Sequence, residues 1–140
     1  LHFCMKKTDP CPCCSEKSYG DCCNLFLGGA KLVLTAEQLM RSRYTAFTLE
    51  KAHYLVETYH PQSRKQDELK ALKKSFKGMM WTGLEIIATN AGTAADSQGE
   101  VEFIAHFKSV GKVGYLHERS RFSKEEGCWF YVDGDILSDG

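Results

Sequence analysis

Six of the seven cysteines in this sequence of 140 residues fall within its first 23 positions. In a reducing compartment thiols stay free, so clustered cysteines indicate metal ligands rather than disulfides. Residues 5–28 contain few large apolar side chains and cannot form a hydrophobic core unaided. Metal binding explains how so small a segment folds, because the free energy of binding becomes free energy of folding.

Two close pairs of cysteines can supply the ligands of one tetrahedral ion. Cys11 and Cys13 are followed by eight residues and then by Cys22 and Cys23. Zinc takes four such ligands at about 2.0–2.3 Å, and one turn between the pairs would bring them together. Cys14 offers an alternative first pair with Cys11, so the spacing leaves five candidates for four positions. Zinc is the favoured ion, and iron is also compatible with four thiolates.

The charge of the chain argues against a general polyanion-binding protein. Its 18 basic and 18 acidic residues give a formal net charge of zero, whereas phosphate contacts need a surplus of lysine and arginine. A zinc ion with four thiolates adds a formal charge of about −2. We therefore expect the cysteine-rich segment to bind a protein partner, and we do not expect it to bind nucleic acid.

No segment of the chain predicts insertion into a membrane. No apolar run approaches the ~20 residues that span a bilayer. Lys6 and Lys7 are followed by no hydrophobic segment, so the first residues do not have the pattern of a secretory signal. We expect a soluble, cytoplasmic protein.

After Gly28 and Gly29 the pattern becomes helical. Thr35 and Gln38 form a capping box at the start of a first helix. Its apolar stripe contains Ala36, Leu39, Met40, Arg43, Tyr44 and Phe47. A second helix is predicted over 51–59, ending before Pro61, and a third over 66–77, ending at Gly78.

Beyond Gly78 the period of the apolar residues changes from 3.6 to 2. Strands are predicted over 81–89, 100–109, 113–123 and 128–133. Short connections between successive strands indicate an antiparallel meander. Helices followed by strands predict an α+β fold, with the helices packed on one face of a curved four-stranded sheet. Trp129 and Tyr131 are assigned to packing on that sheet, and Cys128 to a buried position.

Two resemblances support this organisation. Residues 11–23, CPCCSEKSYGDCC, resemble the SEC-C motif, the zinc-binding tail of the bacterial translocation ATPase SecA. The rest of the chain is similar to the YchJ-like family of bacterial proteins. Four segments carry this second resemblance: LMRSRY at 39–44, HP at 60–61, ERSRF at 118–122 and WFYVDG at 129–134.

The resemblances imply a ligand set, a fold and a domain division. They imply metal ligands at Cys11, Cys13, Cys22 and Cys23, and so decide against Cys14. They imply a SEC-C motif over 5–28, then a cone-shaped, nuclear-transport-factor-2-like (cystatin-like) domain over 29–140. Cys14 and Glu16 stand where the motif has glycines, which tolerate positive φ.

Arg43 is the chemically unusual residue of the predicted domain. It lies in the middle of an apolar helix stripe, and a buried guanidinium needs a carboxylate or several carbonyl partners. Glu118 shares a strand face with Leu116 and Phe122, so it is expected to point inward. We predict that Arg43 and Glu118 meet beneath the helices.

Tyr44 and His60 complete this set of pocket candidates. The favoured interpretation of Arg43 and Glu118 is an ion pair that fixes the first helix on the sheet. The alternative is a ligand pocket in which Glu118 or His60 acts as a general base.

Two functions are compatible with the sequence. In the first, a zinc-bound SEC-C motif docks on a protein partner, a chaperone, a ribosome-associated factor or secretion machinery, while the cone binds a small ligand or a peptide. In the second, the cone is the site of a small-molecule enzyme of the isomerase, dehydratase or hydrolase type. A catalytic metal is not expected, because four cysteines leave no open coordination position.

Overall fold

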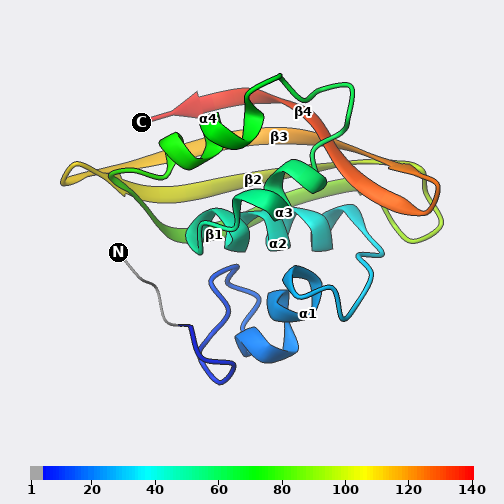
Figure 1. Cartoon of the computed structure of the whole chain (residues 1–140), viewed down its shortest axis with the longest axis horizontal. Helices are drawn as coiled ribbons and strands as arrows, with labels where there is room; N and C mark the ends of the chain where they lie inside the picture. The colour runs from blue at the N-terminus through cyan, green and yellow to red at the C-terminus, as the bar shows by residue number, and fades with distance from the viewer. Residues whose placement is uncertain (1–4) are drawn as a thin grey trace.

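Four antiparallel strands form one sheet in the order β1-β2-β3-β4: β1 (Met79–Ala91), β2 (Gln98–Ser109), β3 (Lys112–Glu125) and β4 (Cys128–Asp139). The structure is a computed structural model, and it describes residues 5–140. Register shifts interrupt the β1–β2 and β3–β4 pairings, and such bulges bend and twist the strands. The predicted meander is confirmed, and the sheet is curved around the helices (Figure 1).

Tight turns close the second and third hairpins. Val110 and Gly111 have φ values of 50° and 79°, and Glu126 and Gly127 have values of 53° and 82°. Two successive positive φ values are typical of the two-residue turns that match the twist of paired strands. Glycine at the second position removes the steric cost there.

β4 is six residues longer than predicted. The predicted strand ended at Asp133. In the structure Gly134 pairs with Ser120 inside the sheet, and a Cβ at Gly134 would collide with the Glu118 carboxylate. The glycine therefore serves close approach of a side chain and does not end the strand.

Three helices cover one face of the sheet: α2 (Ala36–Thr48), α3 (Ala52–Glu57) and α4 (Glu68–Ser75). The predicted capping box is present at α2. The Thr35 hydroxyl accepts from the Gln38 amide at 3.1 Å, and the Gln38 side chain accepts from the Leu34 amide at 2.8 Å. None of the helices in residues 5–140 is long and apolar enough to span a membrane.

Residues 5–28, here called the knuckle, pack against α2 on the side away from the sheet (Figure 1). The knuckle contains a short 3-10 helix, η1 (Tyr19–Asp21), and α1 (Cys23–Leu27). As a result α2 is buried almost all round, including the polar side chains of Ser42 and Thr45, which have no exposed surface.

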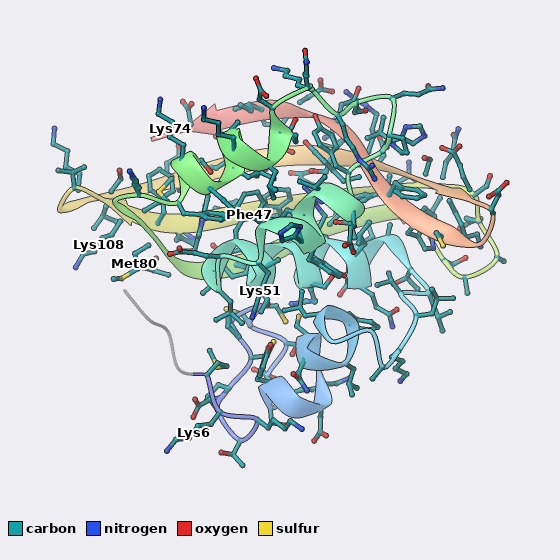
Figure 2. All side chains as sticks on the ribbon, viewed as in Figure 1. Lys6, Phe47, Lys51, Lys74, Met80 and Lys108 are labelled. Atoms are coloured by element: carbon teal, nitrogen blue, oxygen red, sulfur yellow. The ribbon has the colours of Figure 1, made fainter. Side chains whose placement is uncertain are left out.

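The core runs from the knuckle through α2 to the sheet. Cys11, Cys13 and Cys23 belong to the same buried cluster as Leu39 and Phe103. A second cluster joins α2, α3 and α4. There the Phe47 ring, labelled in Figure 2, meets Phe76 edge-on at 6.3 Å, and it also meets Trp81 of the first cluster at 6.2 Å. The knuckle is thus part of the packed body and not a tethered appendage.

Candidate metal centre and cone pocket

The sulfurs of Cys11, Cys13, Cys22 and Cys23 lie within 4.8 Å of one another. The Cys13 and Cys22 sulfurs are 3.7 Å apart. With zinc–sulfur bonds of about 2.3 Å, a tetrahedron has sulfur–sulfur edges of about 3.8 Å. The cluster is therefore compatible with one tetrahedral metal ion and leaves no open coordination position.

Cys14 lies outside this cluster. Its side chain is exposed, and its sulfur accepts from the Leu84 amide of β1 at 3.5 Å. The structure thus brings four of the five candidates together and places the sulfur of Cys14 apart from them. Cys128 is also exposed, so its predicted burial was wrong. It is the first residue of β4, and the side chain after it, Trp129, fills the buried position instead.

A short hairpin brings the cysteine pairs together. Pro10 and Ser18 form an isolated antiparallel bridge, and the Cys11 amide donates to the Lys17 carbonyl at 2.9 Å. The chain then enters η1, where Gly20 lies against Lys7 so closely that a Cβ would be 2.8 Å from the Lys7 Cβ. The hairpin and η1 return the second pair to the first.

Polar groups from α2 and the loop surround the four sulfurs. The Ser15 hydroxyl is 3.1 Å from the Cys22 sulfur, and the Thr45 hydroxyl is 3.8 Å from the Cys11 sulfur. Arg41 donates to the Cys13 carbonyl at 2.7 Å and is held by Glu37 at 3.0 Å. Outer contacts of this kind orient ligands in metal sites, and here they tie Cys11 and Cys13 to α2 and Cys22 to the loop.

The thiols also influence each other's protonation. Hydrogen bonds from Cys13 and Cys23 hold the pKa of the Cys11 thiol at about 3, well below its ordinary value. Hydrogen bonding to Cys11 and Cys13, together with burial, raises the pKa of the Cys23 thiol. A thiolate at Cys11 is thus stabilised within the cluster, and a thiolate is the form that binds metal.

Both residues that replace motif glycines have left-handed backbone conformations. Cys14 has a φ of 63° and Glu16 a φ of 72°. Non-glycine residues adopt this conformation at a cost of about 1–2 kcal/mol each. The loop between the two cysteine pairs therefore carries strain that glycine would relieve.

A groove of about 430 Å³ lies between the knuckle and α2. Its lining includes Lys17, Asp21, Cys22, Phe26, Lys31, Glu37 and Arg41. The groove thus lies beside the cysteine cluster, two members of which line it, and has charges of both signs.

A second cavity of about 180 Å³, here called the cone pocket, lies between α2 and the sheet. Its lining residues are Met40, Arg43, Tyr44, Phe47, Trp81, Phe103, Ala105, Leu116, Glu118, Ser120 and Tyr131. Three of the four pocket candidates, Arg43, Tyr44 and Glu118, therefore share one cavity. Burial raises the pKa of Tyr44 to about 12.

Arg43 and Glu118 do not form the predicted ion pair. Arg43 donates through Nη1 to the Leu55 carbonyl at 2.8 Å and to the Thr58 hydroxyl at 2.6 Å. Glu118 accepts from Ser120 at 2.6 Å and from the Tyr131 phenol at 3.2 Å. Strand alternation correctly placed Glu118 on the inner face, but α3 supplies the acceptors for Arg43.

His60, the fourth pocket candidate, is not among the residues that line this cavity. Its ring nitrogen Nε2 pairs with the Glu125 carboxylate, and the ring meets Phe130 edge-on at 5.8 Å. Its backbone amide donates to the Tyr131 carbonyl at 2.8 Å. His60 thus holds the end of α3 against β4.

Comparison with known proteins places these features in one family. The family model described as YchJ, middle NTF2-like domain, matches residues 35–134. The chain belongs to the YchJ family. UPF0225 protein SCO1677 of Streptomyces coelicolor is 46% identical over 130 residues, covering 93% of this chain and 98% of that protein. UPF0225 protein GSU1048 of Geobacter sulfurreducens is 42% identical over 127 residues, covering 91% of this chain and 79% of that protein.

Solved structures agree with this membership in the YchJ family. A SEC-C motif containing protein from Rhodopseudomonas palustris, RPA3114, has a TM-score of 0.83 at 33% identity, covering 91% of this chain and 98% of that one. Another SEC-C motif containing protein, from Psychrobacter arcticus, has a TM-score of 0.75 at 29% identity, covering 94% of this chain and 85% of that one. A Caulobacter vibrioides protein with a cystatin-like fold, 15% identical with a TM-score of 0.55, shares the fold.

Sequence reasoning missed the central side chain of the pocket in this YchJ family member. Tyr131 was assigned to sheet packing, but its ring lies 4.9 Å from the Arg43 guanidinium carbon, and its phenol donates to Glu118. The signal that could have found it is the strand pairing of Phe122 with Tyr131, which puts both on the face that Glu118 shares.

Proposed function

We propose that this protein binds one zinc ion in the knuckle and works as a binding protein, with the groove engaging a protein partner and the cone pocket holding a small ligand. One observation supports the proposal above all. The four sulfurs converge against α2, and the other side of α2 presents Arg43 and Tyr44 to the cone pocket. A metal at this place would brace the helix that forms both binding surfaces.

A zinc ion in the knuckle fits a structural role, bracing α2, better than a catalytic role. Four thiolates saturate a tetrahedral ion, so substrate would find no free coordination position. The ion would instead hold Cys13 beside Arg41, and Cys11 beside Thr45, and thereby fix how the knuckle sits on α2.

The groove has the character of a protein-binding surface. Its lining combines the cations Lys17, Lys31 and Arg41 with the acidic Asp21 and Glu37, and Phe26 contributes an apolar surface. Nucleic acids need an excess of positive charge, and mixed charge around an apolar centre is typical of protein interfaces. The partner would be of the kind that the SEC-C resemblance implies: a chaperone, a ribosome-associated factor or a component of secretion.

Charge reversal in the groove tests the docking proposal. Removing residues 5–28 would uncover α2, so point substitutions are the sharper tool. The test variant is Lys17→Glu with Lys31→Glu, both exposed beside the groove. The control variant is Lys74→Glu with Lys108→Glu, which Figure 2 shows away from the knuckle, and which are exposed as well.

Each variant is purified from cells under reducing conditions, with metal analysis and identification of the proteins that accompany it. We expect one zinc ion per chain in both variants and partners lost only from the groove variant. The docking proposal is wrong if both variants retain the same partners. The zinc proposal is wrong if the intact chain contains no zinc, and iron would identify the alternative ion.

A small-molecule enzyme is the second candidate function, because Glu118 places a carboxylate on the wall of the cone pocket. Hydrogen bonds from Ser120 and Tyr131 hold this carboxylate in place on the wall, and a general base must be positioned in that way. Glu118→Gln separates the possibilities. A large fall in thermal stability without an effect on ligand binding would assign Glu118 to structure.

A further inference from the structure

Arg43 is a buried cation without a carboxylate partner in residues 5–140. Its residue surface is only 8% exposed, and it forms no ion pair within 4.0 Å. The groups that hold it are a carbonyl, a hydroxyl and the ring faces of Tyr59 and Tyr131, at 5.9 and 4.9 Å. Burial lowers its pKa to about 10, so it stays protonated at neutral pH.

Part of the guanidinium is available to a ligand. Both hydrogen bonds use Nη1, and Nε and Nη2 have no acceptor among the described residues. Among the described residues, every fully buried side-chain nitrogen has a hydrogen-bond partner. Because Nε and Nη2 have none, neither nitrogen is fully buried. Arg43 is among the residues that line the cone pocket, so a ligand there would use these N–H groups. Nε and Nη2 are two neighbouring donors in the fork that matches a carboxylate.

The walls of the pocket define the rest of the ligand. Tyr44, Trp81 and Phe103 give it an apolar, aromatic lining. A cavity of about 150 Å³ holds one benzene ring, so the 180 Å³ of this pocket suits a single ring or a chain of similar size. Glu118 on the same wall would repel a second negative charge.

We propose that the cone pocket binds a small organic monocarboxylic acid, whose carboxylate pairs with Arg43 and whose apolar body lies against Tyr44, Trp81 and Phe103. The assignment rests on the proposed ligand-binding function of the pocket and names the class of ligand. The acid would supply the counter-charge that the fold does not place in contact with Arg43.

Matched probes test the proposal on the full-length, metal-loaded chain at neutral pH. Benzoate carries the carboxylate on a single ring, benzamide is its neutral isostere, and terephthalate adds a second carboxylate. Chemical-shift changes in amide NMR spectra give the affinity of each and locate the site. We expect benzoate to bind at the cone pocket about tenfold or more tightly than benzamide, because the neutral benzamide cannot form a charged hydrogen-bonded pair with Arg43. We expect terephthalate to bind more weakly than benzoate, because its second carboxylate would be repelled by Glu118.

Variants at two arginines complete the test. Arg43→Lys keeps the charge but loses the planar fork, and we expect benzoate affinity to fall about tenfold. Arg121→Lys is the matched control, because Arg121 lies on the outer face of β3 with Asp133 and Asp135, and benzoate affinity should stay unchanged there. The comparison of probes on the unaltered chain holds even if an Arg43 variant fails to fold.

The outcomes distinguish the carboxylate from the pocket. Equal binding of benzoate and benzamide at the pocket would overturn the carboxylate assignment and leave the ligand-binding function intact. Absence of binding by all three probes and by benzene would overturn both. Benzoate binding that shifts only amides outside the pocket would also contradict the assignment.

Discussion

The Arg43 guanidinium carbon lies 4.9 Å from the centre of the Tyr131 ring. The phenol of the same tyrosine donates to the Glu118 carboxylate at 3.2 Å. The Tyr131 side chain thus contacts the guanidinium through its ring and the carboxylate through its phenol. A cation over an aromatic face gains electrostatic energy without a counter-ion. The ring therefore lets the fold bury a cation and still keep donors open to the pocket.

Tyr44, on the same pocket wall, predicts a pH dependence of stability. Burial raises its pKa from 10 to about 12, which corresponds to roughly 2–3 kcal/mol. Because the folded-state pKa is raised, this contribution is complete below pH 10 and is lost as the pH rises through about 12. Tyr44→Phe has no phenol to ionise, so it should become more stable relative to the unaltered chain across that interval.

Urea unfolding at a series of alkaline pH values measures this effect. The control is Tyr115→Phe, on a partly exposed position of β3. An alkaline loss of the same size in the unaltered chain and in Tyr44→Phe would contradict the assignment to Tyr44.

The loop of the metal centre predicts stabilising substitutions. Cys14 and Glu16 have positive φ values of 63° and 72°, and glycine adopts this region without strain. Glycine also raises the entropy of the unfolded chain, which offsets part of the gain. Cys14→Gly and Glu16→Gly should each increase the unfolding free energy by about 0.5–1 kcal/mol.

Denaturant midpoints with metal present give these values. Lys17→Gly is the matched control, because Lys17 belongs to the same exposed loop but is not among the positive-φ residues. It should lose stability, since only the entropic effect remains. Destabilisation by all three glycines would show that the left-handed backbone at Cys14 and Glu16 carries no strain.

The cysteine cluster predicts a strong dependence of stability on one sulfur. Cys13 has no exposed surface, and its sulfur is 3.7 Å from that of Cys22. Cys13→Ser should reduce metal content and lower the free energy of unfolding by at least about 3 kcal/mol, or the melting temperature by roughly 10 °C. Calorimetry with parallel metal analysis is the measurement.

Cys128→Ser provides the control for the same chemical change. Cys128 is exposed at the start of β4, far along the chain from the knuckle. Its substitution should alter neither metal content nor the melting temperature by more than about 1–2 °C. If Cys13→Ser behaved like Cys128→Ser, the four sulfurs would not act together as a metal centre.

Local patterns predicted the elements of this fold well. Thr35 and Gln38 marked the start of α2 because a capping box depends only on residues three apart. Strand alternation placed Glu118 inward because it, too, depends only on the spacing of nearby residues along the chain. The C-terminal end of β4 was missed, because Gly134 lies within the sheet beside the Glu118 carboxylate of another strand. The exposure of Cys128 was missed as well, because Trp129 takes the buried position beside it.

Contacts between distant elements limited prediction of the pocket. The acceptors of Arg43, the Leu55 carbonyl and the Thr58 hydroxyl, come from α3 and the residue after it, and no period in the sequence indicates how α3 crosses α2. The pairing of His60 with Glu125 likewise depends on where the end of α3 meets β4. The sequence therefore predicted which residues face inward, but not which partners they find.

Gly134 predicts a specific coupling with Glu118. A Cβ at Gly134 would overlap the Glu118 carboxylate and would approach the Arg119 carbonyl to 3.1 Å. Gly134→Ala should therefore displace the carboxylate from Ser120 and Tyr131 and lower the unfolding free energy by about 1–3 kcal/mol. In a Glu118→Ala background the same alanine should cost much less, because the colliding atoms are gone.

The double-mutant cycle measures this coupling directly, through denaturant unfolding of the four chains. A coupling energy of about 1 kcal/mol or more is expected for residues that share one contact. Gly127→Ala is the control for the loss of a glycine, because a Cβ there meets no atom within 4 Å and the residue has a φ of 82°. Its cost should be the same in both backgrounds. Additive effects of Gly134→Ala and Glu118→Ala would mean that the glycine does not position the carboxylate.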